Sequence, residues 1–281
     1  MAGGEQIARG AGVDTSFVLL GHDRQEGRWV PQLLVQEGSR ARCAPRWRGF
    51  VAVLAVSFVL AAVAEGQLIF VNAAASGANN GSTWSDAFTK LQDALAAASA
   101  GQDIWVARGV YYPDEGGGQT NNDRLATFQL KNGVGGFAGG ESSLAQRNQA
   151  VNITVLSGDI DQNDTVDANG IVLSHADIAG DNSYQVVRGS NTNASATVDG
   201  FTITGGLANG SVTPCGTVCG AGMLNDNGSP TLFNLVFAGN FAANAGGDMA
   251  NVNGSSPVLT NVRFFQNRAG QGGRDGKFGR E

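Results

Sequence analysis

Proline, cysteine and histidine are scarce in this chain of 281 residues. It has six prolines, three cysteines and two histidines, against 42 glycines. A collagen triple helix needs glycine at every third position together with abundant proline, and the chain has neither feature. A metal site built from cysteine and histidine needs several such ligands, which this chain barely provides. The composition therefore excludes a collagen and argues against a cysteine–histidine metal centre.

Charge is also low, at 15% of the residues, and the balance is acidic with a net charge of −6. Nucleic-acid-binding domains carry a basic stripe or patch, and no basic stripe with interleaved aromatic residues occurs in this sequence. We therefore expect no nucleic-acid partner. The chain is instead rich in glycine and asparagine, which suits a fold with many tight corners.

One segment of the sequence occurs twice, beginning at Ser229 and again at Ser256. The copies read SPTLFNLVFAGN and SPVLTNVRFFQN, so that six residues recur identically at an offset of 27 positions. A glycine-rich stretch precedes each copy. A fixed period of this length is typical of a solenoid, in which each repeat buries its apolar face only against its neighbours.

Apolar residues within the repeat predict β-structure with a corner. Leu232, Leu235 and Phe237 can all face inwards only if the chain bends at Asn234, because asparagine tolerates the left-handed backbone that a corner requires. We predict an all-β, single-stranded right-handed parallel β-helix, in which equivalent side chains stack about 4.8 Å apart. The predicted ladder pairs are Leu232 with Leu259, Asn234 with Asn261, Phe237 with Phe264, and Asn240 with Asn267.

The amino-terminal part of the chain predicts export. Four arginines between positions 40 and 48 precede an apolar run that closes with small residues, so we predict a signal peptide at residues 49–64 with cleavage after Ala64. The run is shorter than the about 20 residues of a membrane span. A retained membrane anchor is the alternative. Because the signal begins late, we interpret residues 1–48 as a wrongly extended reading frame or a disordered leader.

We assign residues 65–273 to the β-helix and expect an α-helix to cover its first coil. The residues that recur at helical spacing are Trp84, Phe88, Leu91 and Leu95. The helix would start after a cap at Thr83 or Ser85 and end near Gly101. Residues 274–281 are charged and aperiodic, and no closing element follows the last repeat. This indicates a truncated chain that has lost further repeats and a cell-surface anchor.

Motifs near the start of the predicted β-helix resemble a known family. Phe70-Val71-Asn72, the Trp84-x-x-Ala87 motif and the segment IWVARGVYYP from Ile104 are similar to the amino-terminal cap and first coil of secreted bacterial β-helix proteins of the pectate-lyase-like superfamily. The segment DGFTI, from Asp199, resembles a common coil of that superfamily, with Gly200 at the corner.

Later repeats resemble a second group of proteins. Phe-x-x-Asn units that start at Phe237 and Phe264 alternate with paired glycines, as in the repeats of polymorphic outer-membrane proteins. The two resemblances imply a secreted or outer-membrane surface protein with a β-helix fold. They are specific for the fold and say much less about activity.

An acidic segment follows the strand predicted at residues 153–156 and offers oxygen ligands at alternating positions. These residues are Asp159, Asp161, Asn163, Asp164 and Asp167. Oxygen ligands of this kind suit Ca²⁺, although the spacing departs from a helix-loop-helix calcium loop at Asp164 and Gly170. The alternative is a solvated turn without a metal.

Two cysteines, Cys215 and Cys219, lie four positions apart in a loop predicted at residues 209–220. In an exported protein we expect them to form a local disulfide, because the compartment is oxidising. His175 is the single histidine after residue 64, and we interpret it as a surface turn residue.

Catalysis is the main alternative to a binding role. The resemblance implies that lyases of this fold use Ca²⁺ with a basic residue, and that hydrolases use clustered aspartates. Asp199 is the most suggestive carboxylate, but it stands beside the corner residue Gly200, where a structural aspartate is common. Arg188 and Arg263 lie in predicted strands with no acidic cluster tied to either. Glycoside hydrolysis needs two carboxylates at a defined separation, and the sequence does not show them.

We therefore expect an exported cell-surface or extracellular β-helix that acts as a non-catalytic stalk, adhesin or carbohydrate-contacting module. Its expected partner is a polysaccharide or another cell-surface ligand, with loops at residues 116–124 and 209–220 offering variation. We expect no cofactor apart from the Ca²⁺ considered above, and no stable membrane span once the signal is cleaved. The alternative function is a lyase or glycoside hydrolase that acts on acidic polysaccharide.

Overall fold

The computed structural model describes residues 19–22, 29–32, 68–99, 101–212 and 214–270. The chain divides into two units, Met1–Leu60 and Ala61–Glu281. In the first unit, β1 (Leu19–His22) and β2 (Trp29–Gln32) pair as an antiparallel hairpin. The second unit contains the repeats. The predicted signal peptide at residues 49–64 and the aperiodic residues 274–281 lie outside the described residues.

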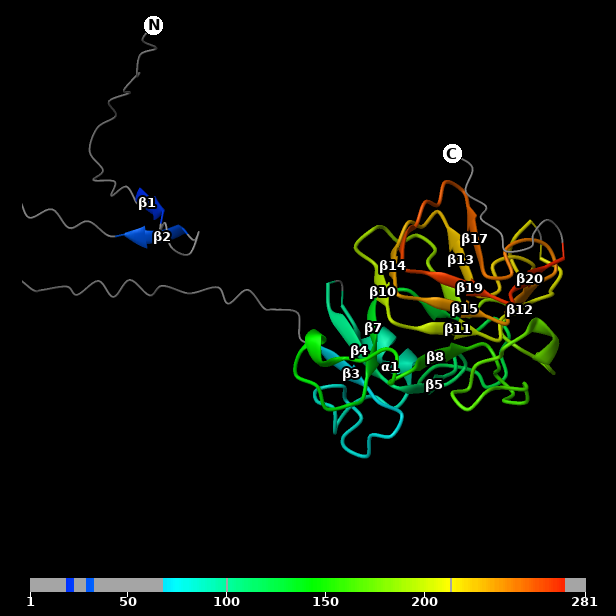
Figure 1. Cartoon of the computed structure of the whole chain (residues 1–281), viewed down its shortest axis with the longest axis horizontal. Helices are drawn as coiled ribbons and strands as arrows, with labels where there is room; N and C mark the ends of the chain where they lie inside the picture. Colours follow the sequence, from blue (N-terminus) through cyan, green and yellow to red (C-terminus); the bar gives the residue numbers. More distant parts are fainter. Residues whose placement is uncertain (1–18, 23–28, 33–67, 100, 213, 271–281) are drawn as a thin grey trace, which may run out of the picture. The chain divides into compact units, whose positions relative to one another are not determined.

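Strands of the second unit form four parallel sheets, and each coil of the chain contributes to the sheets in turn (Figure 1). The first sheet contains β3 (Ile69–Val71), β4 (Asp103–Ala107), β7 (Asn132–Phe137), β10 (Thr197–Asp199), β14 (Thr231–Phe233) and β18 (Val258–Thr260). The second sheet contains β5 (Gly109–Tyr111), β8 (Thr154–Ser157), β11 (Thr202–Thr204), β15 (Val236–Ala238) and β19 (Arg263–Phe265).

The two smaller sheets complete the coils. The third sheet contains β12 (Leu207–Ala208), β16 (Phe241–Ala242) and β20 (Arg268–Ala269). The fourth sheet contains β6 (Phe128–Gln129), β9 (Val187–Arg188), β13 (Met223–Asp226) and β17 (Met249–Val252). In every sheet the strands follow one another in chain order, so each coil lies on the one before it. The prediction of a parallel β-helix is confirmed.

The register of the coils matches the 27-residue offset. Leu232 pairs with Leu259 in the first sheet, and Phe237 pairs with Phe264 in the second. The two phenylalanine rings are stacked, with centroids 5.3 Å apart. Side-chain amides continue the stack, since Asn261 Nδ2 donates to Asn234 Oδ1 at 2.7 Å and Asn240 Nδ2 donates to Asn267 Oδ1 at 2.9 Å.

The corner between the first and second sheets is occupied by residues with a positive φ. Asn234 has a φ of 49°, Asn261 a φ of 53° and Gly200 a φ of 82°. Only glycine, and asparagine among few other residues, adopts this left-handed backbone at low cost. The bend turns Leu232, Leu235 and Phe237 into the same interior, where all three are fully buried. One apolar core therefore runs through the stacked coils.

The α-helix is shorter than the sequence pattern predicts. It is α1, Leu91–Ala97, and its N-cap residue Lys90 makes no side-chain capping bond. Thr83 Oγ1 instead accepts a bond from the Asp86 amide in a preceding turn. The Trp84 side chain faces Phe70 at 4.8 Å between ring centroids and donates to the carbonyl of Glu141. Trp84 follows the helical spacing but serves tertiary contacts outside the helix, so the predicted start was wrong.

The first and the last described coils of the solenoid differ. Helix α1 buries Leu91 and Ala94 in the core beside β3 and so covers the first coil, as expected for a solenoid cap. In the last described coil, Leu259 and Phe264 are 39% and 37% exposed. Their equivalents one coil earlier are fully buried, so the position of a coil in the stack decides whether its ladder residues are covered.

Candidate functional site

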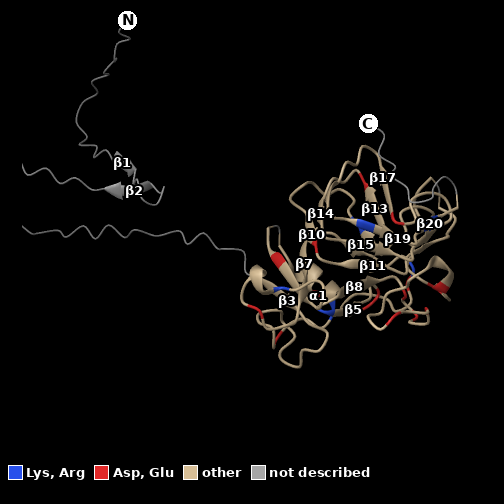
Figure 2. Cartoon of the chain, viewed as in Figure 1, with Lys and Arg blue, Asp and Glu red and all other residues tan. Residues whose placement is uncertain are grey.

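Acidic residues occur in the loops that follow β5 and β8, where the cartoon is coloured red (Figure 2). Asp159 accepts backbone hydrogen bonds from Asn163 at 3.0 Å and from Asp164 at 3.2 Å. Asp164 in turn accepts bonds from the Ala179 amide at 2.6 Å and from Asn182 Nδ2 at 2.7 Å. Asp159 therefore stabilises its own turn, and Asp164 ties the loop to the segment around Ala179, where the Thr165 amide also donates to the Asp177 carbonyl at 3.0 Å.

Of the predicted calcium ligands, Asp159, Asp161 and Asp164 lie close enough for their charges to interact, whereas Asp167 belongs to a separate turn. Asn163 Nδ2 donates to Asp161 Oδ2 at 2.9 Å, so the amide contributes a donor there and not an oxygen. Asp167 caps its own turn by accepting bonds from the amides of Asn169 and Ile171. Within the described ranges, no group of three or more His, Cys, Asp or Glu side chains is arranged to hold a metal ion. Calcium binding by this loop therefore stays a prediction.

Burial changes the ionisation of this loop. It raises the pKa of Asp164 to about 6, and the neighbouring carboxylates of Asp159 and Asp161 raise it further against the hydrogen bonds that lower it. Burial likewise raises the pKa of Asp159. It raises the pKa of Tyr112 to about 12, with an added contribution from the charges of Asp159 and Glu115. A carboxyl whose pKa is raised towards neutrality is a candidate for a general acid.

Asp199, the most suggestive catalytic carboxylate in the sequence, is occupied by structural contacts. Arg147 pairs with one oxygen at 2.5 Å, and Asn234 Nδ2 donates to the other at 2.7 Å. Gln149 adds a third donor at 3.2 Å. Both carboxylate oxygens of Asp199 are thus engaged by neighbouring side chains of the protein. Its place in the corner ladder, where it accepts the bond from Asn234, indicates a structural role.

Neither strand arginine belongs to an acidic site. Arg188 is half-buried in β9, and Arg263 is exposed in β19. The ion pairs found among the described residues join Lys90 to Glu115, Arg124 to Asp181 and Arg147 to Asp199. The structure thus brings no carboxylate into an ion pair with either strand arginine.

Arg124 lies in the loop that follows β5 and connects it to the loop that follows β8 and to the loop that follows β12. Its guanidinium donates to the carbonyl of Asn182 at 2.7 Å and to Asn209 Oδ1 at 2.6 Å. It also lies over the ring of Tyr184, 4.3 Å from the centroid. The variable loops predicted at residues 116–124 and 209–220 therefore lie side by side, held by one arginine.

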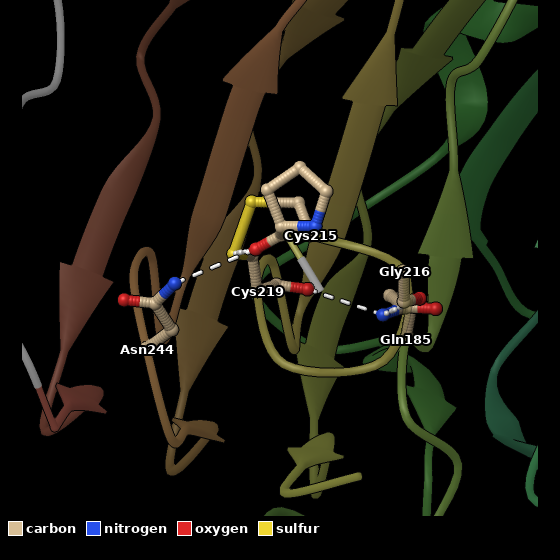
Figure 3. The surroundings of a disulfide bond; sticks show 6 residues. Gln185, Cys215, Gly216, Cys219 and Asn244 are labelled. Carbon is tan, nitrogen blue, oxygen red and sulfur yellow. Dashed lines mark hydrogen bonds between the residues drawn. A yellow bond between two sulfur atoms is a disulfide. The ribbon is translucent and has the colours of Figure 1, made fainter. Parts of the chain in front are cut away.

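A disulfide joins Cys215 to Cys219 in the second of these loops (Figure 3). Gln185 Nε2 donates to the carbonyls of Gly216 and Cys219, both at 3.1 Å, so the loop is tied to the preceding coil. Asn244 Nδ2 reaches the carbonyl of Pro214 from the following coil at 3.4 Å. The loop is thus a fixed feature of the surface between two coils.

His175 begins a short 3-10 helix, His175–Asp177, and is not fully exposed. Its ring is stacked with Phe241 at 6.0 Å between centroids, and its Nε2 lies 3.1 Å from Arg268 Nη1. His175 therefore packs its loop against the third sheet. The sequence predicted only a surface turn residue at this position.

Asparagine side chains line the corner between the fourth and first sheets. We call Asn191, Asn227 and Asn253 the amide row. All three are exposed and have left-handed backbones, with φ of 58°, 53° and 51°. Asn227 Nδ2 donates to Asn191 Oδ1 at 3.3 Å, and Asn253 Nδ2 donates to Asp226 Oδ1 at 2.7 Å. The row presents one amide in each of three successive coils.

Sequence reasoning missed the amide row, although a signal exists. Asn225-Asp226-Asn227-Gly228 returns as Asn251-Val252-Asn253-Gly254, a repeated Asn-x-Asn-Gly motif. Its offset is 26 residues, one fewer than that of the apolar ladder. The step from Asn191 to Asn227 is longer still because the loop with the disulfide intervenes. The motif was therefore hidden from a search at a single period.

No family model, curated protein or solved structure matches this chain. The four parallel sheets define a parallel β-helix solenoid on their own evidence. Among the residues that the structure describes, no helix combines the length and the apolar character needed to cross a membrane.

Proposed function

We propose that this protein is an exported, surface-associated β-helix that contacts polysaccharide without cleaving it, and that the amide row is its contact surface. The observation that carries the proposal is the exposed amide presented once per coil at Asn191, Asn227 and Asn253. A periodic line of donors suits a periodic polymer, because many weak contacts add up to useful avidity.

Two further features support an extracellular role. The predicted signal peptide at residues 49–64 would direct export, and the disulfide between Cys215 and Cys219 is typical of oxidising compartments. Mass spectrometry of the protein secreted from an expressing bacterium would identify its first residue. We expect it to be Glu65; retention of the intact chain in the cytoplasm would contradict export.

The binding proposal is tested by removing the amides while keeping the corners. In Asn227→Gly/Asn253→Gly the left-handed backbone is preserved, since glycine adopts it freely. Loss of several amide–hydroxyl hydrogen bonds should weaken binding to a responsive polysaccharide by about tenfold or more. Affinity electrophoresis against a panel of neutral and acidic polysaccharides would measure the change.

Asn122→Gly is the matched control. Asn122 is exposed, has a φ of 60° and lies outside the amide row. It should leave both stability and binding unchanged. Equal binding by the double variant and the wild type would show that another surface makes the contact.

A second candidate function, hydrolysis of polysaccharide, is favoured by one observation. Asp164, with its pKa raised to about 6, lies in the same loop as the buried carboxyl of Asp159 and so offers a proton donor beside a second acid. The test is release of reducing ends or unsaturated products from pectate and alginate. Activity that Asp164→Asn abolishes would favour the enzyme over the binding module.

A further inference from the structure

A cavity of about 320 Å³ opens at one end of the amide row. It lies among the loop that follows α1, the start of β7 and the turn that precedes β10. Asn191 belongs to both the cavity and the row. Its volume falls at the lower end of the range for small-molecule sites, which is about 300–1,000 Å³. One sugar unit of a polymer lying along the row would enter this cavity.

The cavity is lined by donors whose acceptor atoms are already used. Asn132 Oδ1 accepts a bond from the Thr197 amide at 3.1 Å, and Asn191 Oδ1 accepts one from Asn227 Nδ2. Asn193 Oδ1 accepts two bonds from Ser195, from its amide at 2.9 Å and its hydroxyl at 2.6 Å. Each side chain therefore keeps its NH₂ group for a ligand, and such a site selects for acceptor atoms.

The charge of the cavity has the opposite sign to that of the chain. No lining residue is acidic, whereas the protein has a net charge of −6. Lys131 is the basic residue in the lining, and its ammonium group donates to the carbonyls of Leu95 and Ala98 at the end of α1. Among the described residues it forms no ion pair. Its third proton and its full charge are available to an anion.

The kind of anion follows from the donors. Planar carboxylates are matched best by the two-pronged guanidinium of arginine, and no arginine lines this cavity. Lys131 offers a point charge, and the amides of Asn132 and Asn193 approach from two different elements, which suits the three terminal oxygens of a tetrahedral group. A sulfate monoester carries one negative charge and so balances one lysine, whereas a phosphate monoester carries about −1.5 to −2.

We propose that this cavity binds the sulfate ester of a sulfated sugar, with Lys131, Asn132 and Asn193 as the donors. The inference rests on the proposed function, because it names the class of polysaccharide that the amide row would contact. It also predicts that a single sulfated sugar binds without the polymer.

The test uses the full chain and titrates it with galactose 6-sulfate, galactose 6-phosphate, galacturonic acid and galactose by calorimetry or NMR. We expect galactose 6-sulfate to bind and galactose to fail. Asn193→Asp should weaken sulfate binding at least tenfold, because it replaces the NH₂ donor with a carboxylate oxygen. Its other oxygen can still accept the two bonds from Ser195, so the fold should be unchanged by circular dichroism.

Asn122→Asp is the control, since it adds the same charge at an exposed asparagine outside the cavity. Lys131→Met should also abolish binding. Because this substitution also removes the hydrogen bonds from Lys131 to the end of α1, the melting temperature of the variant is measured to show that it remains folded. Equal affinity for galacturonic acid, or unchanged sulfate binding by Asn193→Asp, would overturn the inference.

The two proposals fail in different ways. Binding of galactose 6-sulfate together with the absence of any polysaccharide binding would sustain the cavity and refute the amide row. Polysaccharide binding that Asn227→Gly/Asn253→Gly weakens, with no binding of galactose 6-sulfate, would do the reverse.

Discussion

The penultimate coil (β14 to β17) and the last described coil (β18 to β20) have closely similar sequences and very different surroundings. Leu232 and Phe237 are fully buried in the first, whereas Leu259 and Phe264 are more than one-third exposed in the second. The backbone is the same in both, with left-handed residues at Asn234 and Asn261. Sequence therefore determines the shape of a coil, and the neighbouring coil determines how much that coil contributes to stability.

The largest expected difference between the two coils is at the leucine of the ladder. Leu232→Ala should lower the free energy of unfolding by about 2–5 kcal/mol, because it removes buried methyl groups and leaves a cavity. Leu259→Ala should cost about 1 kcal/mol or less, because its side chain is already partly hydrated. Urea unfolding of both variants measures the difference. Equal losses would mean that the last coil is covered in solution.

A smaller difference is expected at Asn240 and Asn267, which lie at the corner between the second and third sheets. Asn240 is fully buried, and its Nδ2 donates to the carbonyls of Ile203 and Ala238. Asn240→Ala leaves these acceptors unpaired and should cost about 1–3 kcal/mol. Asn267→Ala, one coil later, should cost less because water can replace the lost amide. Equal losses in the free energy of unfolding for Asn240→Ala and Asn267→Ala would contradict this expected difference between the two coils.

At the left-handed corner the two coils should behave alike. Alanine at Asn234 or Asn261 is strained by the positive φ, whereas glycine is not. The difference between the alanine and glycine variants should be about 1–2 kcal/mol at each position, since this backbone strain does not depend on burial. Thermal or urea unfolding of the four variants tests this. A difference between the alanine and glycine variants at Asn234 but not at Asn261 would show that the backbone at Asn261 can change its conformation to avoid the strain.

The last comparison separates the ladder from the acidic loop. The pKa of Asp164 is raised in the folded state to about 6 from 3.8, so the folded protein binds this proton more tightly than the unfolded chain. Its contribution to stability is fully present below pH 3.8 and is lost as the pH rises through about 6. In Asp164→Asn this part of the pH dependence should vanish from melting curves recorded between pH 4 and 7. An unchanged pH profile would contradict the raised pKa.

Much of the fold follows from sequence because its rules are local and repeated. The spacing of Leu232, Asn234 and Phe237 requires a bend, and the copy 27 residues later requires the same bend in the next coil. Stacking then follows, since neither copy can bury its apolar residues alone. This is why the ladder could be described residue by residue before any coordinates were known.

The helix and the acidic loop were harder to predict because tertiary contacts decide them. Trp84 and Phe88 have helical spacing, yet Trp84 packs on Phe70 and Phe88 bridges to Val71. The acidic side chains also look convergent in sequence, but the path of the loop directs Asp164 to Ala179 and Asp167 to its own turn. Spacing alone does not reveal which backbone amide a carboxylate will meet.

The candidate binding surface was not predicted, for a related reason. The amide row combines Asn191, Asn227 and Asn253, whose separations differ because loops of unequal length lie between them. Lys131 and Asn193 meet at the cavity although 62 positions separate them in the chain. Contacts of this kind arise only when coils are stacked. Adjacent coils are always the same distance apart in space, but the number of residues between equivalent positions varies from coil to coil.

The loops between the third and fourth sheets show how much the solenoid tolerates at its surface. Fourteen residues separate β12 from β13, but only six separate β16 from β17. The flanking strands nevertheless pair in register, Ala208 with Ala242 and Met223 with Met249. The loop at this point can therefore be several residues longer or shorter without changing the pairing of the coils above and below. The scaffold is modular there, so new surface chemistry can be acquired by lengthening one loop while the core keeps its period.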